Sequence, residues 1–477
     1  MKARFIALTD INRGIEQDDI QSLVRLLLYS NQIDIEGLIA CTSCFVKRGA
    51  RRKHLKIIHD VIDAYEKVRA NLLLHEPGFP EADALRVVAC TGVPAFGKSE
   101  GNGFADAAYD GCPGVKRILD AADREDPRPL WIGLWGGANT LAQAVWTARR
   151  QRSDEAFDRF LSKLRIYGIS DQDHAAPWLR ARFGEKLFYI VSPSCADRSG
   201  ARDYWRATWP GISADRNRNG SEDGSKGGGF SGADGEMVGN AWLGKNIISH
   251  GVYGKAYPRS RFIMEGDTPS YLGLIPNGLN EPEHPDYGGW GGRYERRVPS
   301  ATPGLLPENH PIWTNAADTV TGSDGRLHTS PQATIWRWRA AYQNDFAARM
   351  DWTVARAYAG ANHPQQVRFA HPVRLEAAAG APVELDASPS FDPDGDALSF
   401  HWFFYREAGS PGVTLSLENS DSSRARFVAP DIPPEAETLS LHILVEVRDG
   451  GTPVLTRYGR VVVDIVKTAR ASVCGNE

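Results

Sequence analysis

The sequence predicts an α/β domain over residues 1–365 and an all-β sandwich over residues 366–477. The first prediction rests on apolar runs that alternate with segments of helical spacing, a rhythm typical of a mostly parallel sheet flanked by helices. The second rests on short period-two strands, separated by Pro, Gly and Asp turns, that follow residue 365. A length of 477 residues fits two or three domains.

Each element of the α/β domain has its own pattern. Strands are expected where short apolar runs end in glycine or polar residues, at 5–8, 33–42, 130–134, 164–169 and 187–191. Helices are expected where apolar residues recur at helical spacing, at 20–29, 52–70, 177–183 and 332–354. The segment 92–114 is expected to be loop. The glycine-rich stretch 215–234 suits a lid over the site and a disordered excursion about equally.

The sandwich strands are expected at 382–388, 398–405, 424–428, 439–449 and 454–466. The pattern Phe-Asp-Pro-Asp-Gly-Asp at 391–396 resembles the polycystic kidney disease-type immunoglobulin-like modules of bacterial secreted enzymes. Trp402 is the only one of the 13 tryptophans beyond residue 360. Because a polysaccharide-binding face needs a row of exposed aromatics, we expect the sandwich to be structural.

Composition excludes two classes of partner. The net charge of −4 gives no electrostatic footprint for a nucleic acid polymer or an anionic membrane. No apolar run approaches the ~20 residues needed to cross a bilayer. We expect no signal peptide, because Met1 stands almost directly before the first strand.

Three aspartates lie between the first strand and the first helix. Asp10 follows the strand, and Asp18 and Asp19 begin the helix, which is where open α/β sheets place their ligand sites. Capping of the helix dipole is the alternative explanation for the Asp pair. Capping needs one carboxylate, whereas Ca²⁺ needs several oxygens from different segments. Asp10 therefore favours a metal site.

Two further strand ends carry candidate site residues. The strand at 164–169 ends in a loop with Asp171, Asp173 and His174, on the sheet edge expected for Asp10. A polar loop in which an aspartate caps the following helix explains these residues equally well. The strand at 130–134 leads into Trp-Gly-Gly, where glycines let backbone groups approach a ligand or simply form a tight turn.

Two segments late in the sequence contain the remaining candidate site residues. Glu265, Gly266 and Asp267 follow a short apolar run and precede Pro269, where a helix could begin. Aromatics between glycines at 277–294 suit a sugar or base face, because glycine supplies no packing partner. A surface loop with incidental aromatics is the alternative. The candidates there are Trp290, Arg293 and the possible general acid His284.

These motifs resemble those of the nucleoside hydrolases, and more specifically a bacterial group that carries a C-terminal sandwich and includes proteins labelled cellulose-binding. Asp10, Asp18 and Asp19 are similar to the family's N-terminal aspartate cluster, Trp135-Gly136-Gly137 to its Thr-Gly-Gly element, and Asp267 to the aspartate of its late His-Asp-Pro element.

The sequence also departs from the family. Leu8 occupies the position of the first aspartate, and the loop from Asp10 to Asp18 is longer. Gly266 replaces the histidine that serves as leaving-group acid for purines in part of the family. The family asparagine falls at Thr140, one place after Asn139.

The resemblance implies a role for each candidate. Ca²⁺ would be held by Asp10, Asp19, the Trp135 carbonyl and Asp267. Substrate would be held by Asp18, Asn139, Asp171, Asp173 and His174; Trp290 and Arg293 are added to this group from their own pattern, not from the resemblance. Asp10 would also act as the base toward a metal-activated water. Glu265 or His284 would replace the missing acid, or the leaving group would need no protein acid.

Two functions follow as expectations. The first is a calcium-dependent glycoside hydrolase that cleaves an N- or O-linked pentofuranosyl bond of a small glycoside. The second is a non-catalytic carbohydrate (cellulose)-binding protein on a degenerate hydrolase fold, which the residues at positions 8 and 266 favour. The resemblance implies a secreted or periplasmic protein; a cytoplasmic location and a homo-oligomer stay open.

Overall fold

The computed structural model describes residues 2–97, 99–193, 205–213, 232–261, 263–299 and 308–467. The chain divides into two compact units, one formed by Met1–Ile275 and Asn280–Ala361, and the other by Pro276–Leu279 and Asn362–Glu477. Most of the glycine-rich stretch 215–234 lies outside the described residues.

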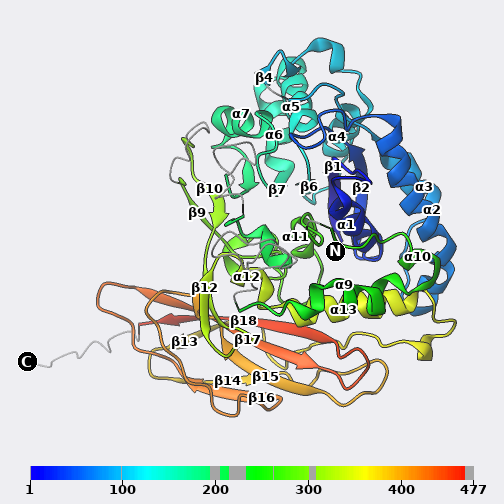
Figure 1. Cartoon of the computed structure of the whole chain (residues 1–477). Helices are drawn as coiled ribbons and strands as arrows, with labels where there is room; N and C mark the ends of the chain where they lie inside the picture. Colours follow the sequence, from blue (N-terminus) through cyan, green and yellow to red (C-terminus); the bar gives the residue numbers. More distant parts are fainter. Residues whose placement is uncertain are drawn as a thin grey trace, which may run out of the picture. The chain divides into compact units, whose positions relative to one another are not determined.

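The first unit is built on an eight-stranded sheet with the order β3-β2-β1-β6-β7-β8-β10-β9 (Figure 1). All neighbours pair in parallel except β9, which is antiparallel to β10. The strands are β1 Ala3–Thr9, β2 Ile33–Ala40, β3 Ala89–Thr91, β6 Leu130–Leu134, β7 Leu164–Gly168, β8 Phe188–Ile190, β9 Tyr294–Arg297 and β10 Ile312–Asn315. The predicted mostly parallel sheet is confirmed.

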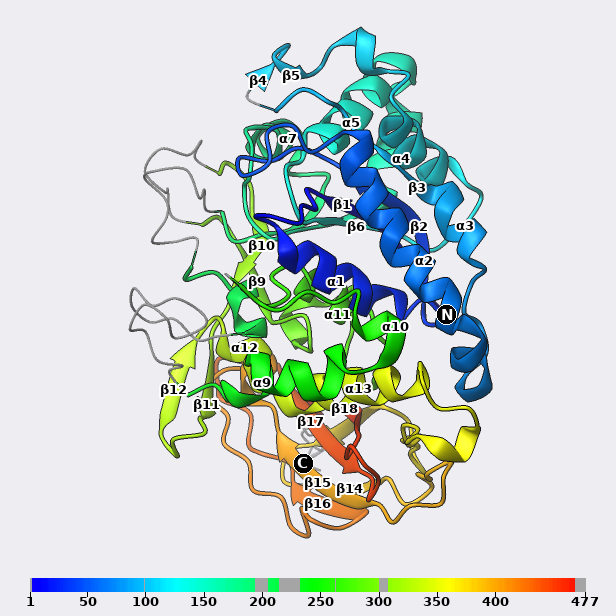
Figure 2. The same ribbon diagram turned by 45° about the vertical axis from the view of Figure 1, so that its right-hand side comes forward.

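Helices flank this sheet on both faces (Figures 1 and 2). One group consists of helices in mutual contact, α4 Pro113–Asp123, α5 Asn139–Gln151, α6 Asp154–Lys163 and α7 Ala175–Phe183. The other group is α1 Gln17–Leu27, α2 Arg52–His75, α10 Gly251–Gly254 and α13 Arg339–Trp352. Apolar side chains of the sheet and of α4 to α7 form a continuous buried core.

Shorter elements complete the unit. The helices are α3 Ala82–Val88, α9 Asn240–Leu243, α11 Pro269–Leu272, α12 Ala333–Trp336, the π-helix η4 Gly244–Ile248, and the 3-10 helices η1 Ala107–Tyr109, η2 Trp209–Ile212, η3 Glu236–Val238, η5 Pro285–Tyr287 and η6 Tyr358–Gly360. The strand pairs are β4 Ser99–Glu100 with β5 Gly103–Phe104, and β11 Asp318–Thr321 with β12 Leu327–Ser330.

The helix expected at 332–354 is in fact two helices, α12 and α13. Trp338, which separates them, has φ −101° and ψ 8°, outside the helical range. The buried guanidinium of Arg339, the first residue of α13, donates to the carbonyls of Gly211 and Asp234. These long-range contacts accompany a break that the amphipathic pattern does not contain.

The strand order reverses direction between β1 and β6. From β1 the chain moves through β2 to β3, and it then returns to β6 on the other side of β1 and continues to β7 and β8. Such a reversal leaves a crevice at the carboxyl ends of the two central strands, where open α/β sheets bind ligands. Asp10 follows β1 and Trp135 follows β6, so both lie at this switch point.

The second unit holds a four-stranded sheet, β13-β18-β17-β15, and a two-stranded sheet, β14-β16. Its elements are β13 Arg374–Ala378, β14 Pro382–Asp386, β15 Ser399–Phe404, β16 Arg424–Val428, β17 Thr438–Arg448, β18 Thr456–Val466 and η7 Arg406–Ala408. Side chains of both sheets share one core, which contains Trp402. The predicted strand-rich domain is confirmed; β13 was not expected, because its Leu-Glu-Ala-Ala sequence has low strand propensity.

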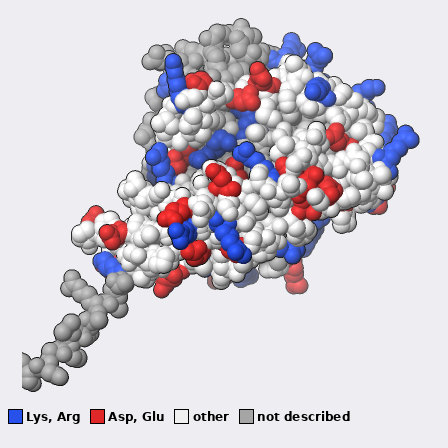
Figure 3. All heavy atoms as spheres, turned by 90° about the horizontal axis from the view of Figure 1, so that it is seen from below, with Lys and Arg blue, Asp and Glu red and all other residues white. Residues whose placement is uncertain are grey.

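None of the described helices combines the length and the hydrophobicity that a membrane span requires. On the face drawn in Figure 3, Lys and Arg are interspersed with Asp and Glu. This mixture fits the near balance of 55 basic and 59 acidic residues.

Candidate metal centre

Two N-terminal aspartates, Asp18 and Asp19, converge on Asp267, which lies more than 240 positions later in the sequence, and Asp10 lies beside Asp19. Asp10 leaves the end of β1, Asp18 and Asp19 occupy the first turn of α1, and Asp267 directly precedes the turn into α11. Asp10 and Asp19 are each 1% exposed, and Asp267 is 3% exposed. The parallel sheet thus buries acidic side chains from separate segments at one strand edge.

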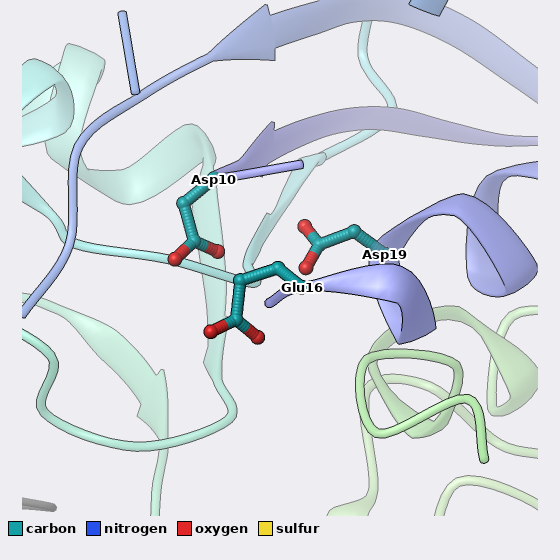
Figure 4. Close-up of side chains that lie close together, drawn as sticks. All are labelled: Asp10, Glu16 and Asp19. Atoms are coloured by element: carbon teal, nitrogen blue, oxygen red, sulfur yellow. The ribbon is translucent and has the colours of Figure 1, made fainter. Parts of the chain in front are cut away.

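The carboxylates form two triads that could hold a metal ion. One consists of Asp10, Glu16 and Asp19, the other of Asp18, Asp19 and Asp267, and within each triad the oxygens lie within 4.8 Å of one another. Figure 4 shows the first triad, with Glu16 coming from the loop between β1 and α1. Asp19 belongs to both, whereas Asp10 and Asp267 belong to different triads.

Glu16 is the site residue that the sequence-based prediction missed. It lies in the loop between Asp10 and Asp18, and the family resemblance assigned no role to any residue of that loop. An acidic residue in an insertion flanked by site aspartates was the available signal.

Hydroxyl groups hold two of the carboxylates in place. Ser43 Oγ donates to Asp10 Oδ2, and Thr9 Oγ1 donates to Asp19 Oδ1. Within the described parts of the chain, the buried oxygens Asp10 Oδ1 and Asp267 Oδ2 accept no hydrogen bond. An orphaned buried carboxylate oxygen is costly unless a cation or a proton compensates it.

Burial and mutual repulsion raise the pKa of every carboxyl group in the cluster. Desolvation raises the pKa of Asp10 to about 7, against the hydrogen bond from Ser43 and together with the charge of Asp18. Desolvation also raises the pKa of Asp18 to about 6. The pKa values of Asp19, Asp267 and Glu16 are raised by burial first and then by the neighbouring carboxylates. No cationic side chain of the described residues is among the causes of these pKa shifts.

The backbone around Trp135 also suits a cation. Its carbonyl accepts a hydrogen bond of 2.6 Å from Gln172 Nε2, and a carbonyl has a second lone pair that stays available. Gly136 packs so tightly that a Cβ there would lie 2.9 Å from the Asp10 Cβ. The indole of Trp135 turns to Ser270, to which its nitrogen donates at 2.8 Å. The Trp135 side chain therefore contacts Ser270, and its carbonyl oxygen remains available to a cation.

The glycine at the family's histidine position has a local explanation. A Cβ on Gly266 would lie 2.8 Å from Asp18 Oδ2, closer than side-chain carbons approach such oxygens. The hydrogen bond from the backbone of Gly266 to Asp18 also favours the ionised carboxylate. A histidine at position 266 would therefore require Asp18 to move.

Asp171 was expected to hold a sugar hydroxyl, but its carboxylate is fully engaged. Arg180 Nη1 and Nη2 donate to its two oxygens, each at 2.8 Å. Both side chains are 1% exposed. A bidentate buried ion pair leaves little capacity for a ligand, so these contacts favour a structural role for Asp171.

Asp173 and Asn139 form hydrogen bonds between loops at the same sheet edge. Asp173 accepts hydrogen bonds from the backbone nitrogens of Asn139, at 3.0 Å, and Ala175, at 2.9 Å, and so satisfies the starts of α5 and α7. The Asn139 amide donates to the Ala95 carbonyl at 2.5 Å. His174 is exposed, and its backbone nitrogen donates to the Gly97 carbonyl. Sugar binding by these three residues stays a prediction.

The contacts of Glu265 do not fit the role of leaving-group acid that we expected for it. Its carboxylate accepts a 2.6 Å hydrogen bond from Arg25 Nη1 and further bonds from Tyr257 and Thr268. The side chains of Arg25 and Glu265 are both 0% exposed. These contacts favour a structural role for Glu265 in the core between α1, α11 and α13, and its role as an acid stays a prediction.

The aromatic segment does not form the sugar-binding face we expected. Trp290 is 0% exposed and packs edge-on against Tyr342. Arg293 forms an ion pair of 2.7 Å with the fully buried Asp318. His284 is exposed, stacks on Tyr287 and lines a pocket whose walls include none of the clustered carboxylates. Glycine neighbours here accompany tight packing instead of exposure.

The comparisons with known proteins bear on this centre. Residues 4–294 match the family model described as "Cellulose-binding Sde182, nucleoside hydrolase-like domain". The chain belongs to this family. Residues 382–465 match the model "Cellulose-binding protein Sde0182, C-terminal domain". The acidic centre lies within the Sde182 nucleoside hydrolase-like domain.

A solved structure supports the same family. It is described as a nucleoside hydrolase-related hypothetical protein from Saccharophagus degradans that is associated with carbohydrate metabolism, and it is 32% identical to this chain. The match covers 98% of this chain and 100% of that one, with a TM-score of 0.77. The PKD domain of the KIAA 1837 protein matches 22% of this chain and 93% of its own at 20% identity, with a TM-score of 0.17, too low to bear on the fold. Among curated proteins, none matches.

The raised pKa values predict a pH dependence of the metal-free Sde182-type domain. Folding raises the pKa of Asp10 from 3.8 to about 7, so the folded state binds more protons than the unfolded state between these values. This contribution to stability is present at low pH and is lost as the pH rises toward 7. We expect Asp10→Asn to become more stable relative to wild type by more than about 1 kcal/mol between pH 4 and 7 in chelator.

Denaturant unfolding of both proteins at each pH measures this difference. Comparing the two proteins cancels the opposite pH dependence of stability that carboxylates with lowered pKa values contribute. Asp60, which is partly exposed, is one of these, because Lys56 and Arg13 lower its pKa despite some burial. A stability difference that stays constant from pH 4 to 7 would contradict the prediction.

Proposed function

We propose that the carboxylate centre holds Ca²⁺ and that the protein hydrolyses a pentofuranosyl bond of a small glycoside. The observation that carries the proposal is the cluster of five converging carboxylates, two of which keep a buried oxygen without a partner in the described chain. An isolated group of this kind would be strongly unfavourable in a folded protein. A bound cation removes this cost.

Ca²⁺ suits the donor set better than a transition metal. The candidates are carboxylate and carbonyl oxygens, which hard cations prefer, with no histidine in either triad. Asp10, Asp19, Asp267 and the Trp135 carbonyl would hold the ion, and Glu16 and Asp18 lie close enough to join them. When bound, the ion would increase the acidity of a water molecule.

Residues of the protein would then bind the substrate and accept the proton of the attacking water. Asp18, partly oriented by the Gly266 backbone, would accept hydrogen bonds from sugar hydroxyls. Asp10 would take the proton from the attacking water as the water oxygen bonds to the anomeric carbon. The bond to the leaving group would break through an oxocarbenium-like state, and its electron pair would go to the leaving group.

The leaving group sets the substrate class. Gly266 offers no acid, Glu265 is held by Arg25, and His284 lines a separate pocket. We therefore propose substrates whose leaving group departs without protonation by these residues. Aryl pentofuranosides and pyrimidine nucleosides fit this description better than purine nucleosides.

Hydrolysis by wild type and Asp10→Asn tests the proposal. We expect wild type with Ca²⁺ to cleave p-nitrophenyl ribofuranoside or arabinofuranoside faster than inosine. Asp10→Asn should lose at least about 100-fold in kcat/KM, the usual contribution of a general base. Asp60→Asn serves as control, because Asp60 pairs with Arg13 near the same loop but outside the cluster. Full activity of Asp10→Asn on every cleaved substrate would refute the assigned base.

The second candidate is carbohydrate binding without catalysis, in the secreted or periplasmic location that the resemblance implies. Leu8, at the family aspartate position, is 0% exposed and belongs to the apolar core, so this part of the catalytic motif has become structural. The family name also refers to cellulose binding. Wild-type protein that sediments with insoluble cellulose in the presence of chelator, and cleaves no glycoside of the panel, would establish this alternative.

A further inference from the structure

We propose that Glu16 is an additional ligand of the metal ion, supplied by the extended loop between β1 and α1. The inference rests on the proposed metal centre and adds to it a donor that the nucleoside hydrolase motif does not contain. It makes the centre of this protein more enclosed by protein oxygens, and so leaves fewer positions for water and for substrate hydroxyls.

The loop is folded so that the Glu16 side chain lies close to Asp10 and Asp19. The backbone nitrogen of Asn12 donates to the Glu16 carbonyl at 3.2 Å and closes the loop. Within it, Asn12 Oδ1 accepts from the nitrogens of Gly14 and Ile15, and Gln17 Nε2 donates to the Arg13 carbonyl. These bonds within the loop stabilise a conformation in which the Glu16 carboxylate lies beside Asp10 and Asp19 (Figure 4).

Capping does not account for the Glu16 side chain. Glu16 is the N-cap residue of α1, yet its side chain forms no capping hydrogen bond with the helix. Its charged neighbours in the cluster are Asp10, Asp18 and Asp19, all of the same sign, and its protonated carboxyl group donates a hydrogen bond to the Asp18 carboxylate. A carboxyl group that lies beside other carboxylates, without a capping role, is suited to exchange this shared proton for a shared cation.

An independent observation points to a ligand at the same place. Asp10, in the triad with Glu16, is 1% exposed, and its Oδ1 accepts no hydrogen bond from any described residue. The oxygen therefore lies in the cluster ready for coordination. The triad supplies three carboxylates from three consecutive segments: the end of β1, the loop and the first turn of α1.

The consequence concerns coordination number. Ca²⁺ takes six to eight oxygens, and Asp10, Asp19, Asp267 and the Trp135 carbonyl leave several positions to water or substrate. Glu16 fills one such position, or two if it binds through both oxygens. Calcium affinity rises with the number of charged ligands, so loss of Glu16 should weaken binding and admit water.

Terbium luminescence tests the proposal directly. Tb³⁺ occupies calcium sites, and its emission lifetimes in H₂O and D₂O give the number of bound waters without any need for catalysis. We expect Tb³⁺ on full-length Glu16→Ala to carry about one to two more waters than on wild type. Calcium calorimetry should show a Kd increased about 10-fold or more in the same variant.

Two controls separate ligation from loop disruption. Ile15→Ala changes a neighbouring side chain that is 52% exposed, and should alter neither the water count nor the Kd. Thermal unfolding in chelator should show Glu16→Ala at least as stable as wild type, because removal of a like charge relieves repulsion. A residue with a purely structural role would instead destabilise the metal-free protein when removed.

The outcomes distinguish this inference from the proposed function. If wild type binds no Ca²⁺ or Tb³⁺, the proposed metal centre fails, and the inference fails with it. If wild type binds the metal and Glu16→Ala has an unchanged water count and Kd, only the role of Glu16 is overturned.

Discussion

Simultaneous replacement of Asp10 and Asp267 by alanine is expected to abolish tight Ca²⁺ binding. The two residues lie 257 positions apart in the sequence, yet each contributes a buried carboxylate with an unpartnered oxygen, one to each triad that contains Asp19. Loss of two charged ligands from a calcium site should raise the Kd by at least about 100-fold. Isothermal titration calorimetry with Ca²⁺ on the metal-free proteins measures this change.

A matched control removes the same charge elsewhere in the first unit. The side chains of Asp83 and Asp154 are 89% and 80% exposed, so Asp83→Ala/Asp154→Ala should bind Ca²⁺ as wild type does. Unfolding in chelator provides a second check. The Asp10/Asp267 variant should be no less stable than wild type there, because its buried like charges are reduced. Unchanged Ca²⁺ affinity in the Asp10/Asp267 variant would remove the basis of the proposed mechanism.

Glu265→Ala is expected to destabilise the protein by about 3–5 kcal/mol, the usual cost of leaving one member of a buried ion pair alone. Arg25 would keep its bonds to the Tyr342 carbonyl and Gln343 but lose its only carboxylate partner among the described residues, in a site where it is 0% exposed. Tyr257 and Thr268 would each lose an acceptor. Urea unfolding of both proteins with saturating Ca²⁺ measures the difference.

The pair Glu66 and Arg86 is the appropriate comparison. It has the same 2.6 Å separation as Arg25 and Glu265, but the Glu66 side chain is 54% exposed. Glu66→Ala should therefore change stability very little, because water screens an exposed ion pair. Equal losses in the two variants would mean that burial does not set the importance of Glu265. A folded Glu265→Ala variant with normal stability and greatly reduced hydrolysis would return Glu265 to the catalytic candidates.

Residues at strand ends were predictable because local patterns define them. Apolar runs identified β1 and β6, and the parallel arrangement brings the residues that follow them, Asp10 and Trp135, to one edge. Asp18 and Asp19 were predictable as the start of α1. The prediction of Asp267 as a site residue depended on the family resemblance, since a short apolar run alone does not specify which loop reaches this edge of the sheet.

Other assignments depended on partners that are distant in the sequence. Arg25 meets Glu265 across 240 positions, and Arg180 occupies both oxygens of Asp171. A carboxylate looks the same in the sequence whether it faces a ligand or a guanidinium. Trp290 seemed exposed because of its glycine neighbours, but the same glycines let the backbone pack closely around it: a Cβ on Gly291 would lie 2.9 Å from the Gly273 backbone.

The α/β class, the strand-rich C-terminal region and the acidic residues at the switch point could be predicted from the sequence, because periodicity and strand-end position are local properties. The grouping of the carboxylates, with Glu16 among them, and the pairing of Glu265 and Asp171 with arginines became visible in the folded chain. The physical reason is that coordination and ion pairing depend on distances of a few ångströms between segments, and these distances are set by the packing of the whole unit.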